Sequence, residues 1–395
     1  MVVEFSASAG ANTKDIAQTG RSPSGEPEMI AQPRHRFHAI CPYFAMFPEE
    51  FAAKWIERIS ERNMTIFDPF CGRGTAPFQA LLMGRRAIGA DINPAAYCVT
   101  RAKTNAPALS QVRHRLTLLE KRFHLRRWSL RSAQIPEFFR WAFDSVTLSQ
   151  LLYLREVLAW RVSDTDCMIA ALILGALHGE SETSSQYLSN QMPRTISTKP
   201  AYSVRFWEKH GYVAPKRDVF DLVRGRLLYR YETPPPPRRG EVYLTDMRQM
   251  PRILAGRKKI RAVITSPPYL DVTEFEEDQW LRLWFLGGPS APTYGVVSKD
   301  DRTESAVRYW DFVTDMWRMP GQPVDTRAHV VIRMGGKGLW PEQLVDGLKA
   351  TSLASGRKVM LADYEVGEIK GRQTNAFRPG SRGCKLEVDC HFRVA

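Results

Sequence analysis

Cysteine is scarce in this sequence of 395 residues, and its six cysteines are scattered without a Cys-x-x-Cys pair or a zinc-ligand spacing. We therefore expect no disulfide framework and no bound metal, a pattern typical of a reduced cytosol. Long apolar runs are also missing, so the sequence predicts no membrane-spanning helix. Residues 1–32 lack the apolar core of an export signal, and their composition predicts a flexible tail.

Acidic residues are few relative to basic ones. The chain has 42 Asp and Glu against 56 Lys and Arg, which gives a formal charge of +14 and a pI near 9.6. Such an excess attracts phosphate groups and releases their counterions on binding. The composition therefore favours a nucleic-acid partner.

A glycine-rich segment, Asp68-Pro-Phe-Cys-Gly-Arg-Gly-Thr75, lies between a strand-like run at 64–67 and a helix-like stretch at 77–83. Gly72 and Gly74 allow positive φ, and the start of a helix offers N–H groups to a carboxylate. Residues 86–91 are typical of a second strand, and they end in an acid placed as a ribose-binding carboxylate is in dinucleotide folds. Gly-x-Gly alone would also fit an ordinary tight turn.

A second motif, Ser266-Pro-Pro-Tyr269, directly follows the apolar run at 262–265. The exocyclic amine of a nucleobase is a poor nucleophile because its lone pair is conjugated with the ring. Acceptors at Ser266 Oγ and the Pro267 carbonyl would turn that lone pair toward an incoming methyl group. The prolines hold these acceptors rigidly and add no N–H donor, while Tyr269 offers a face to a base extruded from the helix. Read alone, the tetrapeptide would also fit a plain loop break.

Together the motifs resemble those of the DNA amino-methyltransferases that use S-adenosylmethionine, and the initial serine is most similar to the cytosine-N4 branch. Adenine-N6 enzymes more often begin this motif with Asp or Asn. The resemblance covers roughly residues 34–105 and 240–395. It assigns catalysis to Ser266, Pro267, Pro268 and Tyr269.

The resemblance also implies the cofactor contacts. The methionine part would lie against the glycine-rich segment, the ribose against Asp91 and the adenine edge against Asp246. The stretch 38–48 is similar to the element that closes over the cofactor carboxylate, although this chain has Met46 and Arg73 where the family has Lys and a second Ser. The implied cofactor-binding residues are Asp68, Pro69, Phe70, Gly72, Gly74, Thr75, Asp91, Asp246, His38 and Tyr43.

The order of motifs predicts the architecture. We expect a Rossmann-like α/β methyltransferase domain at 33–108 and 240–395, with a mostly parallel twisted sheet whose antiparallel end is formed by strands at 358–361 and 385–394. A largely helical insert at 109–239 would recognise DNA, and the proline-rich residues 234–240 would be the seam where it rejoins the catalytic domain.

Basic residues concentrate between 113 and 131, where Leu116, Leu119, Phe123 and Trp128 would pack inward on a helix. Two further segments, 189–195 and 199–207, combine amides, Arg and aromatics. A solvated basic helix or a polar loop would look similar. The candidate DNA contacts are Arg126, Arg127, Asn190, Gln191, Arg194 and Arg205.

The predicted reaction is direct methyl transfer from S-adenosylmethionine to N4 of a flipped cytosine in double-stranded DNA. A restriction-modification or epigenetic role in a bacterial or phage-derived cytoplasm, with a possible cognate restriction endonuclease, would suit such an enzyme. The chain has no Pro-Cys dipeptide for attack at a base carbon. Three alternatives stay open: an adenine-N6 enzyme, an RNA guanine methyltransferase, and a non-catalytic DNA-binding subunit.

Overall fold

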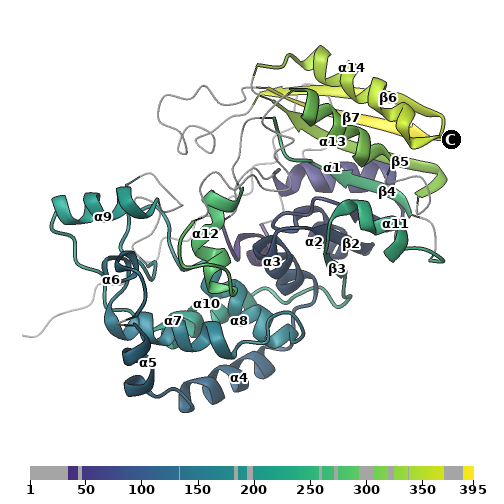
Figure 1. Cartoon of the computed structure of the whole chain (residues 1–395). Helices are drawn as coiled ribbons and strands as arrows, with labels where there is room; N and C mark the ends of the chain where they lie inside the picture. Colours follow the sequence, from purple (N-terminus) through teal and green to yellow (C-terminus); the bar gives the residue numbers. More distant parts are fainter. Residues whose placement is uncertain are drawn as a thin grey trace, which may run out of the picture. The chain divides into compact units, whose positions relative to one another are not determined.

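A mixed β-sheet lies at the centre of the protein (Figure 1). The computed structural model describes residues 34–42, 47–132, 134–181, 186–193, 199–257, 260–270, 275–292, 306–318, 324–336, 338–368 and 386–395. Within these residues the sheet has seven strands in the order β3-β2-β1-β4-β5-β7-β6. The strands are β1 (Thr65–Asp68), β2 (Arg86–Asp91), β3 (Glu241–Leu244), β4 (Ile260–Thr265), β5 (Val324–Gly335), β6 (Val359–Glu368) and β7 (Leu386–Val394).

Strand direction confirms the predicted mostly parallel sheet. Neighbours from β3 to β5 pair in parallel, whereas β7 pairs antiparallel with both β5 and β6. The last strand of the chain therefore inserts between β5 and β6 instead of extending the sheet edge. As a result, side chains of β7 lie next to the end of β5.

Alternating residues of the central strands explain why both faces of the sheet are covered. Ile66 and Ile264 face a core with α1 (Glu49–Ile59) and α2 (Thr75–Leu82), whereas Phe67 and Val263 face the opposite core. That second core is built from α11 (Met250–Ile253), α13 (Ala306–Arg318) and α14 (Pro341–Ser352). A strand buried on both faces reads as a continuous apolar run, which is the pattern found at residues 262–264 of β4.

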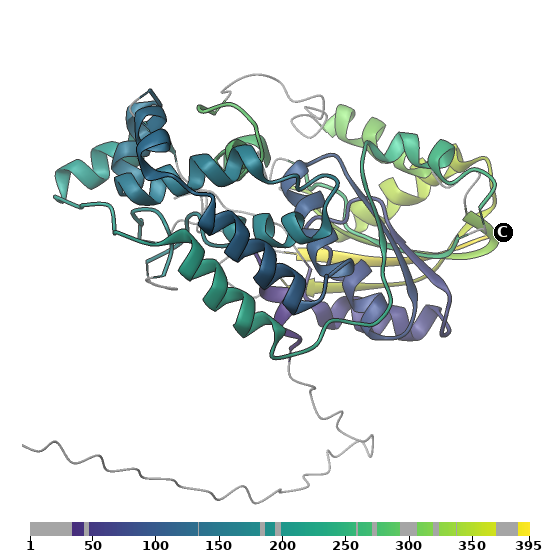
Figure 2. The same ribbon diagram turned by 90° about the horizontal axis from the view of Figure 1, so that it is seen from below.

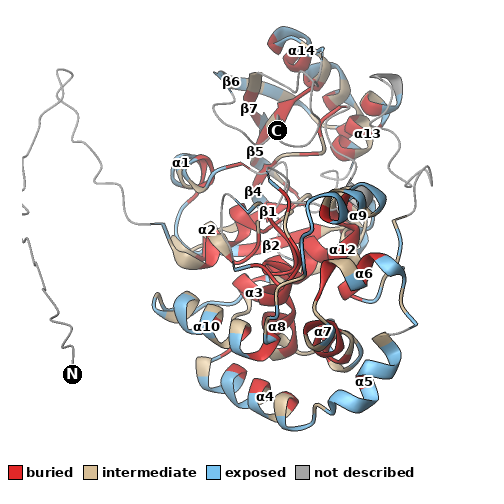
Figure 3. Cartoon of the chain, turned by 90° about the vertical axis from the view of Figure 1, so that its left-hand side faces the viewer, coloured by how far each residue is buried: buried red, intermediate tan, exposed pale blue. Residues whose placement is uncertain are grey.

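A group of helices follows α3 (Pro94–Thr104) and gathers beside it (Figures 1 and 2). Their apolar faces share one core with α3 and with α12 (Phe275–Phe285), and the outer surfaces of α4 and α5 are largely exposed (Figure 3). Residues His35–Ala395 accordingly form one compact unit, so the helical insert is not a separate one. These helices are α4 (Leu109–Lys121), α5 (Leu125–Ser132), α6 (Glu137–Ala142), α7 (Ser145–Val157), α8 (Asp164–Leu174), α9 (Pro200–Lys209) and α10 (Val219–Tyr231).

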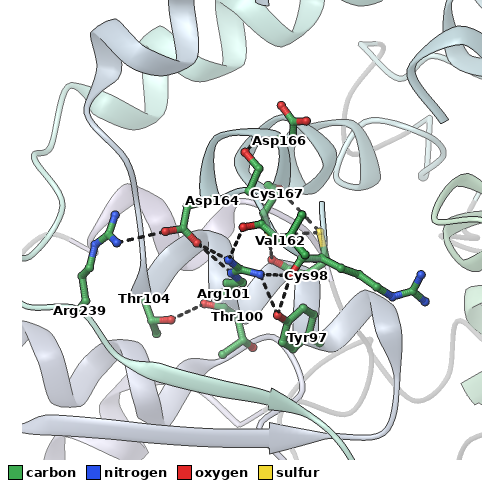
Figure 4. Close-up of polar contacts among 12 residues, drawn as sticks. Tyr97, Cys98, Thr100, Arg101, Thr104, Val162, Asp164, Asp166, Cys167 and Arg239 are labelled. Atoms are coloured by element: carbon green, nitrogen blue, oxygen red, sulfur yellow. Dashed lines mark hydrogen bonds and ion pairs between the residues drawn. The ribbon is translucent and has the colours of Figure 1, made fainter. Parts of the chain in front are cut away.

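A polar cluster ties the return of this insert to α3 (Figure 4). Asp164, in the first turn of α8, accepts from Arg101 Nε at 2.9 Å and lies 3.2 Å from Arg239 Nη1. Arg101 also donates to the Tyr97 hydroxyl at 2.9 Å. Because Arg239 lies two residues before β3, one carboxylate holds together the helix that leaves the sheet and the segment that comes back to it. No helix in the described parts of the chain is long and apolar enough to cross a membrane.

Candidate active site

The two sequence motifs meet where the strand order reverses. β1 lies between β2 and β4, and ligands of open α/β sheets bind beyond the carboxyl ends of the strands at such a switch point. Asp68 ends β1, and Thr265 ends β4 directly before Ser266. Thr265 Oγ1 donates to Asp68 Oδ1 at 2.7 Å. The glycine-rich segment is therefore hydrogen-bonded to the residue directly before the tetrapeptide, although the two partners lie 197 positions apart in the chain.

The glycine-rich segment forms the predicted turn between β1 and α2. Gly72 and Gly74 have φ of 50° and 75°, in the left-handed region that favours glycine. A Cβ on Gly74 would lie 2.6 Å from Thr100 Oγ1, so this glycine is needed where the loop approaches α3. Thr100 Oγ1 also donates to the Gly72 carbonyl at 2.9 Å. Thr75 begins α2, and Phe70 packs against Phe312 of α13.

Asp68 is fully buried at the base of this loop. Burial raises its pKa to about 7. The hydrogen bonds from Thr265 and Phe70 favour the ionised form and oppose this rise, whereas the nearby charge of Asp91 adds a smaller rise. Asp68 Oδ1 accepts from Thr265 and from the Phe70 N–H, while Oδ2 has no hydrogen-bond partner among the described residues. An orphaned carboxyl oxygen in this position is suited to a cationic N–H donor.

Two other carboxylates lie at the carboxyl ends of the parallel strands, which we call the sheet edge. Asp91 ends β2, and its two oxygens accept from the Gly72 and Asn93 N–H groups at 2.9 and 2.8 Å. These bonds fix the carboxylate next to the glycine loop, as a ribose-binding acid requires. Asp246 follows β3, but both of its oxygens are engaged by Arg248, at 2.8 and 2.5 Å. Its predicted contact with an adenine edge stays a prediction.

Arg73, which stands where the family has serine, ties the loop to neighbouring elements. Its side chain is only 4% exposed. It donates to the His38 carbonyl and to Thr75 Oγ1, both at 3.3 Å, and lies 3.7 Å from Glu49 Oε2. His38 is itself buried, with Nε2 at 3.0 Å from Gln79 Oε1 of α2. His38, the first residue of the predicted cofactor-closing element, thus packs on the helix that follows the loop, while Tyr43 and Met46 lie outside the described residues.

The tetrapeptide has a partly buried serine and a nearly buried tyrosine. Ser266 Oγ donates to the Tyr269 hydroxyl at 3.4 Å, and that hydroxyl donates to Glu387 Oε1 of β7 at 2.7 Å. Tyr269 is 8% exposed, and burial raises the pKa of its phenol well above the ordinary value, with the Glu387 charge as the next cause. The tyrosine is therefore a neutral donor that links the loop to the far side of β5.

Glu387 is held in turn by a cation on β5. Arg333 Nη1 lies 3.6 Å from Glu387 Oε2, and Arg333 makes a bidentate pair with Asp389 at 2.6 and 2.7 Å. The Arg333 guanidinium also lies 4.0 Å from the centroid of the Phe51 ring of α1. Thr265, Arg333 and Glu387 have no motif of their own in the sequence. Only the position of β7 beside β5 reveals that Glu387 reaches the loop.

The cysteine next to the glycines is not a nucleophile. Cys71 is buried, and burial followed by the charges of Asp91 and Asp68 raises its pKa well above the ordinary value. Its thiol lies 3.7 Å from Thr100 Oγ1. This environment agrees with the expectation that no thiolate attacks a base carbon.

The predicted DNA-contact residues occupy different environments. Arg126, Arg127 and Arg205 are exposed, whereas Arg194 lies outside the described residues. Asn190 is buried, and its Nδ2 donates to the Trp141 and Tyr212 carbonyls at 3.2 and 3.4 Å, so its amide supports the loop. Gln191 is partly buried, with Nε2 3.4 Å from the Gly179 carbonyl. Leu116, Leu119 and Trp128 are buried, which confirms the predicted inward face of the basic segment.

The residues at the sheet edge fit S-adenosylmethionine. Its amino-acid ammonium would match the orphaned Asp68 Oδ2, and its ribose hydroxyls would match the fixed acceptors of Asp91. The positive-φ glycines hold the loop backbone between these two acids. Within the described residues, no group of His, Cys, Asp or Glu is placed to hold a metal ion.

The chain is similar to solved methyltransferase structures only at low identity. An rRNA methyltransferase, AviRa from Streptomyces viridochromogenes, has 14% identity and a TM-score of 0.32 over 89% of this chain and 87% of that chain. TrmN from Thermus thermophilus has 10% identity and a TM-score of 0.34 over 91% of this chain and 53% of that chain. The Rossmann-like assignment rests on the chain's own strand order and switch-point loops.

Sequence comparison finds relatives for one segment of the chain. Residues 13–101 match the N6_N4_Mtase family model, described as DNA methylase. The chain is also 32% identical over 89 residues to the type II methyltransferase M.MvaI of Kocuria varians, a match that spans 22% of this chain and about a fifth, 19%, of that relative. The segment matched by the family model contains β1, the glycine-rich loop and β2, and therefore both Asp68 and Asp91. Over these residues the chain is similar to the N6/N4 DNA methylases, whose cofactor is S-adenosylmethionine.

Proposed function

We propose that this protein methylates the exocyclic amine of a base in double-stranded DNA, with N4 of cytosine as the target. The observation that carries this proposal is the Thr265–Asp68 hydrogen bond, because it joins the strand end that leads directly into the tetrapeptide to the glycine-rich segment at the switch point. Serine at the first position of the tetrapeptide favours cytosine. Adenine-N6 methylation needs the same geometry and is the second candidate.

When bound, S-adenosylmethionine would supply the methyl group for the new bond to the amine nitrogen, and the electron pair of the broken carbon–sulfur bond would stay on sulfur. The chain's own residues prepare the nitrogen. Ser266 Oγ and the Pro267 carbonyl accept hydrogen bonds from the amine, so its lone pair turns out of conjugation. The amine proton becomes acidic as the nitrogen is alkylated and leaves to water, so no buried general base is required.

DNA binding would use the exposed cations of α4 and α5, which we call the basic surface: Arg113, Lys121, Arg122, Arg126 and Arg127. Two neighbouring arginines are already paired, since Arg115 binds Asp166 at 2.7 Å and Arg131 pairs with Glu156. Exposed cations on adjoining helices suit the sequence-independent attraction of phosphates. Arg205 on α9 is a further candidate contact.

Helix α12, which lies closest in sequence after the tetrapeptide, links this chemistry to the insert. Trp280 and Trp284 are buried, and Trp284 packs against Phe139 of α6 with ring centroids 4.5 Å apart. Arg155 of α7 donates to the Trp284 carbonyl at 2.7 Å. A rigid connection of this kind would keep the DNA-binding helices in register with the catalytic loop.

The deciding experiment is expression of the full chain in a host that lacks DNA methylation. Its genome is read by modification-sensitive sequencing, and its DNA is digested to nucleosides for mass spectrometry. We expect N4-methylcytosine in one sequence context. N6-methyladenine would identify the second candidate, and unmodified DNA from cells that contain folded protein would contradict both. Calorimetry with S-adenosylmethionine then separates an inactive enzyme from a DNA-binding subunit, because only the former binds the cofactor.

A further inference from the structure

We propose that Glu387, acting through Tyr269, sets the direction of the Ser266 hydroxyl so that the serine oxygen faces the target amine as an acceptor. This inference rests on the proposed function and assigns to β7 a residue that positions the catalytic loop. It starts from a continuous series of contacts, Ser266 to Tyr269 at 3.4 Å and Tyr269 to Glu387 at 2.7 Å.

The chemistry of the three groups fixes the order of donation. An ionised carboxylate only accepts, so the Tyr269 O–H must donate to Glu387. The tyrosine oxygen is then available as an acceptor, and the serine O–H donates to it. The serine proton thereby points away from the substrate side, and the lone pairs of Ser266 Oγ are left to receive an amine N–H. A hydroxyl that rotated freely would present its proton to the amine for part of the time.

The surroundings make Glu387 suited to this role. It comes from a strand that lies beyond β5, so its position does not depend on the loop that it orients. Arg333 lies beside its second oxygen at 3.6 Å and is itself fixed by the bidentate pair with Asp389. The Arg333 guanidinium thereby holds the Glu387 carboxylate in place beside the Tyr269 hydroxyl. Tyr269 is nearly buried, so water competes little for the relay.

The principal test is Glu387→Gln in the full chain, with the duplex identified by genome sequencing as substrate. A glutamine amide can also donate to the tyrosine, which turns the tyrosine O–H toward Ser266 and releases the serine proton toward the substrate. We expect kcat to fall about tenfold, with the dissociation constants for DNA and S-adenosylmethionine within about twofold of wild type. Glu365→Gln is the matched control, since Glu365 lies on β6 and pairs with Lys54 and Arg58 instead.

A second measurement separates hydrogen-bond direction from a structural effect. Replacing the target cytosine by uracil, or a target adenine by hypoxanthine, exchanges an amine donor for a carbonyl acceptor. A serine held as an acceptor disfavours that carbonyl, so wild type and Glu365→Gln should discriminate against the carbonyl base more strongly than Glu387→Gln, by about tenfold. The cost of the altered base pair is common to all three proteins and cancels in this comparison.

Tyr269→Phe tests the same relay if the Glu387 variant fails to fold. This variant leaves Glu387 and Arg333 in place. It should lower kcat and the discrimination against the carbonyl base as much as Glu387→Gln does. Where both variants fold, the double variant should lose no more than either single one. Unchanged kcat in Glu387→Gln, or a loss of kcat with wild-type discrimination, would overturn the relay while leaving the proposed function intact. A folded wild-type chain that transfers no methyl group would overturn both.

Discussion

The sheet edge and the basic surface handle charge in opposite ways. At the sheet edge Asp68 and Arg73 are buried, and each is fixed by short-range partners: Asp68 is bound by Thr265, and Arg73 contacts the His38 carbonyl and Glu49. Buried Lys103 donates to the Arg73 carbonyl in the same cluster. On α4 and α5 the cations of the basic surface are exposed, and the apolar side chains beneath them form the core.

The buried charges fix the geometry of the two loops, whereas the exposed charges attract DNA. Buried, paired charges are costly to move, so they hold the catalytic loop and the cofactor loop in one arrangement. Exposed cations are weakly constrained and act over about a Debye length, which suits the capture of a phosphate backbone in many registers. Substitutions at the sheet edge should therefore change chemistry or stability, whereas substitutions on the basic surface should change affinity.

The largest effect is expected for Ser266→Ala, which removes an acceptor from the proposed amine site. Loss of a preorganised transition-state contact typically lowers kcat by about a hundredfold or more. Steady-state methylation assays on the identified duplex would measure it, and calorimetry would show cofactor affinity close to wild type. Near-normal turnover in both this variant and Tyr269→Ala would remove the tetrapeptide from the mechanism.

Asp68→Asn tests the cost of the buried acid. An unfolded aspartate ionises near 3.9, whereas burial raises the pKa of Asp68 to about 7 in the folded chain. The folded state binds this proton more tightly, so the contribution to stability is complete below pH 4 and is lost as the pH rises toward 7. Asparagine cannot ionise, so the variant should gain about 2 kcal/mol relative to wild type between pH 5 and pH 8. Thermal unfolding at both pH values measures this difference, and parallel behaviour would contradict the raised pKa.

Arg126→Ala combined with Arg127→Ala tests the exposed side of the comparison. Each lost phosphate contact should reduce the slope of log affinity against log salt concentration by about one. The two substitutions together should weaken DNA affinity about tenfold. Binding titrations at several salt concentrations give both quantities. Arg224→Ala is the control, because that guanidinium already pairs with Glu120 and Asp221 at 2.6 Å each. An equal loss in the control would mean that overall charge, and not this surface, attracts DNA.

The predictability of these two regions from sequence differs for a physical reason. The strand, glycine turn and helix around Asp68 are local, so residues 64–91 predict β1, α2 and β2 closely. The relay contact between Tyr269 and Glu387 joins residues 118 positions apart, and it depends on β7 inserting between β5 and β6. Nothing in the residues around Glu387 indicates that pairing. Similarly, the amides at 190 and 191 look alike in sequence, and only burial distinguishes the loop-supporting Asn190.

Asn190→Ala gives the smallest expected effect and tests whether that distinction holds. The Asn190 amide donates to the Trp141 and Tyr212 carbonyls, so its removal leaves two backbone acceptors without this donor. We expect a loss of about 1 kcal/mol in the free energy of unfolding, with an unchanged recognition sequence. Chemical denaturation measures the first and genome sequencing the second. A relaxed recognition sequence with unaltered stability would instead make Asn190 a base-reading residue, and the loop would then have to open when DNA binds. Because the amide is held by carbonyls on both sides of the loop, such opening would break the contacts that now join residues 141 and 212 to this segment.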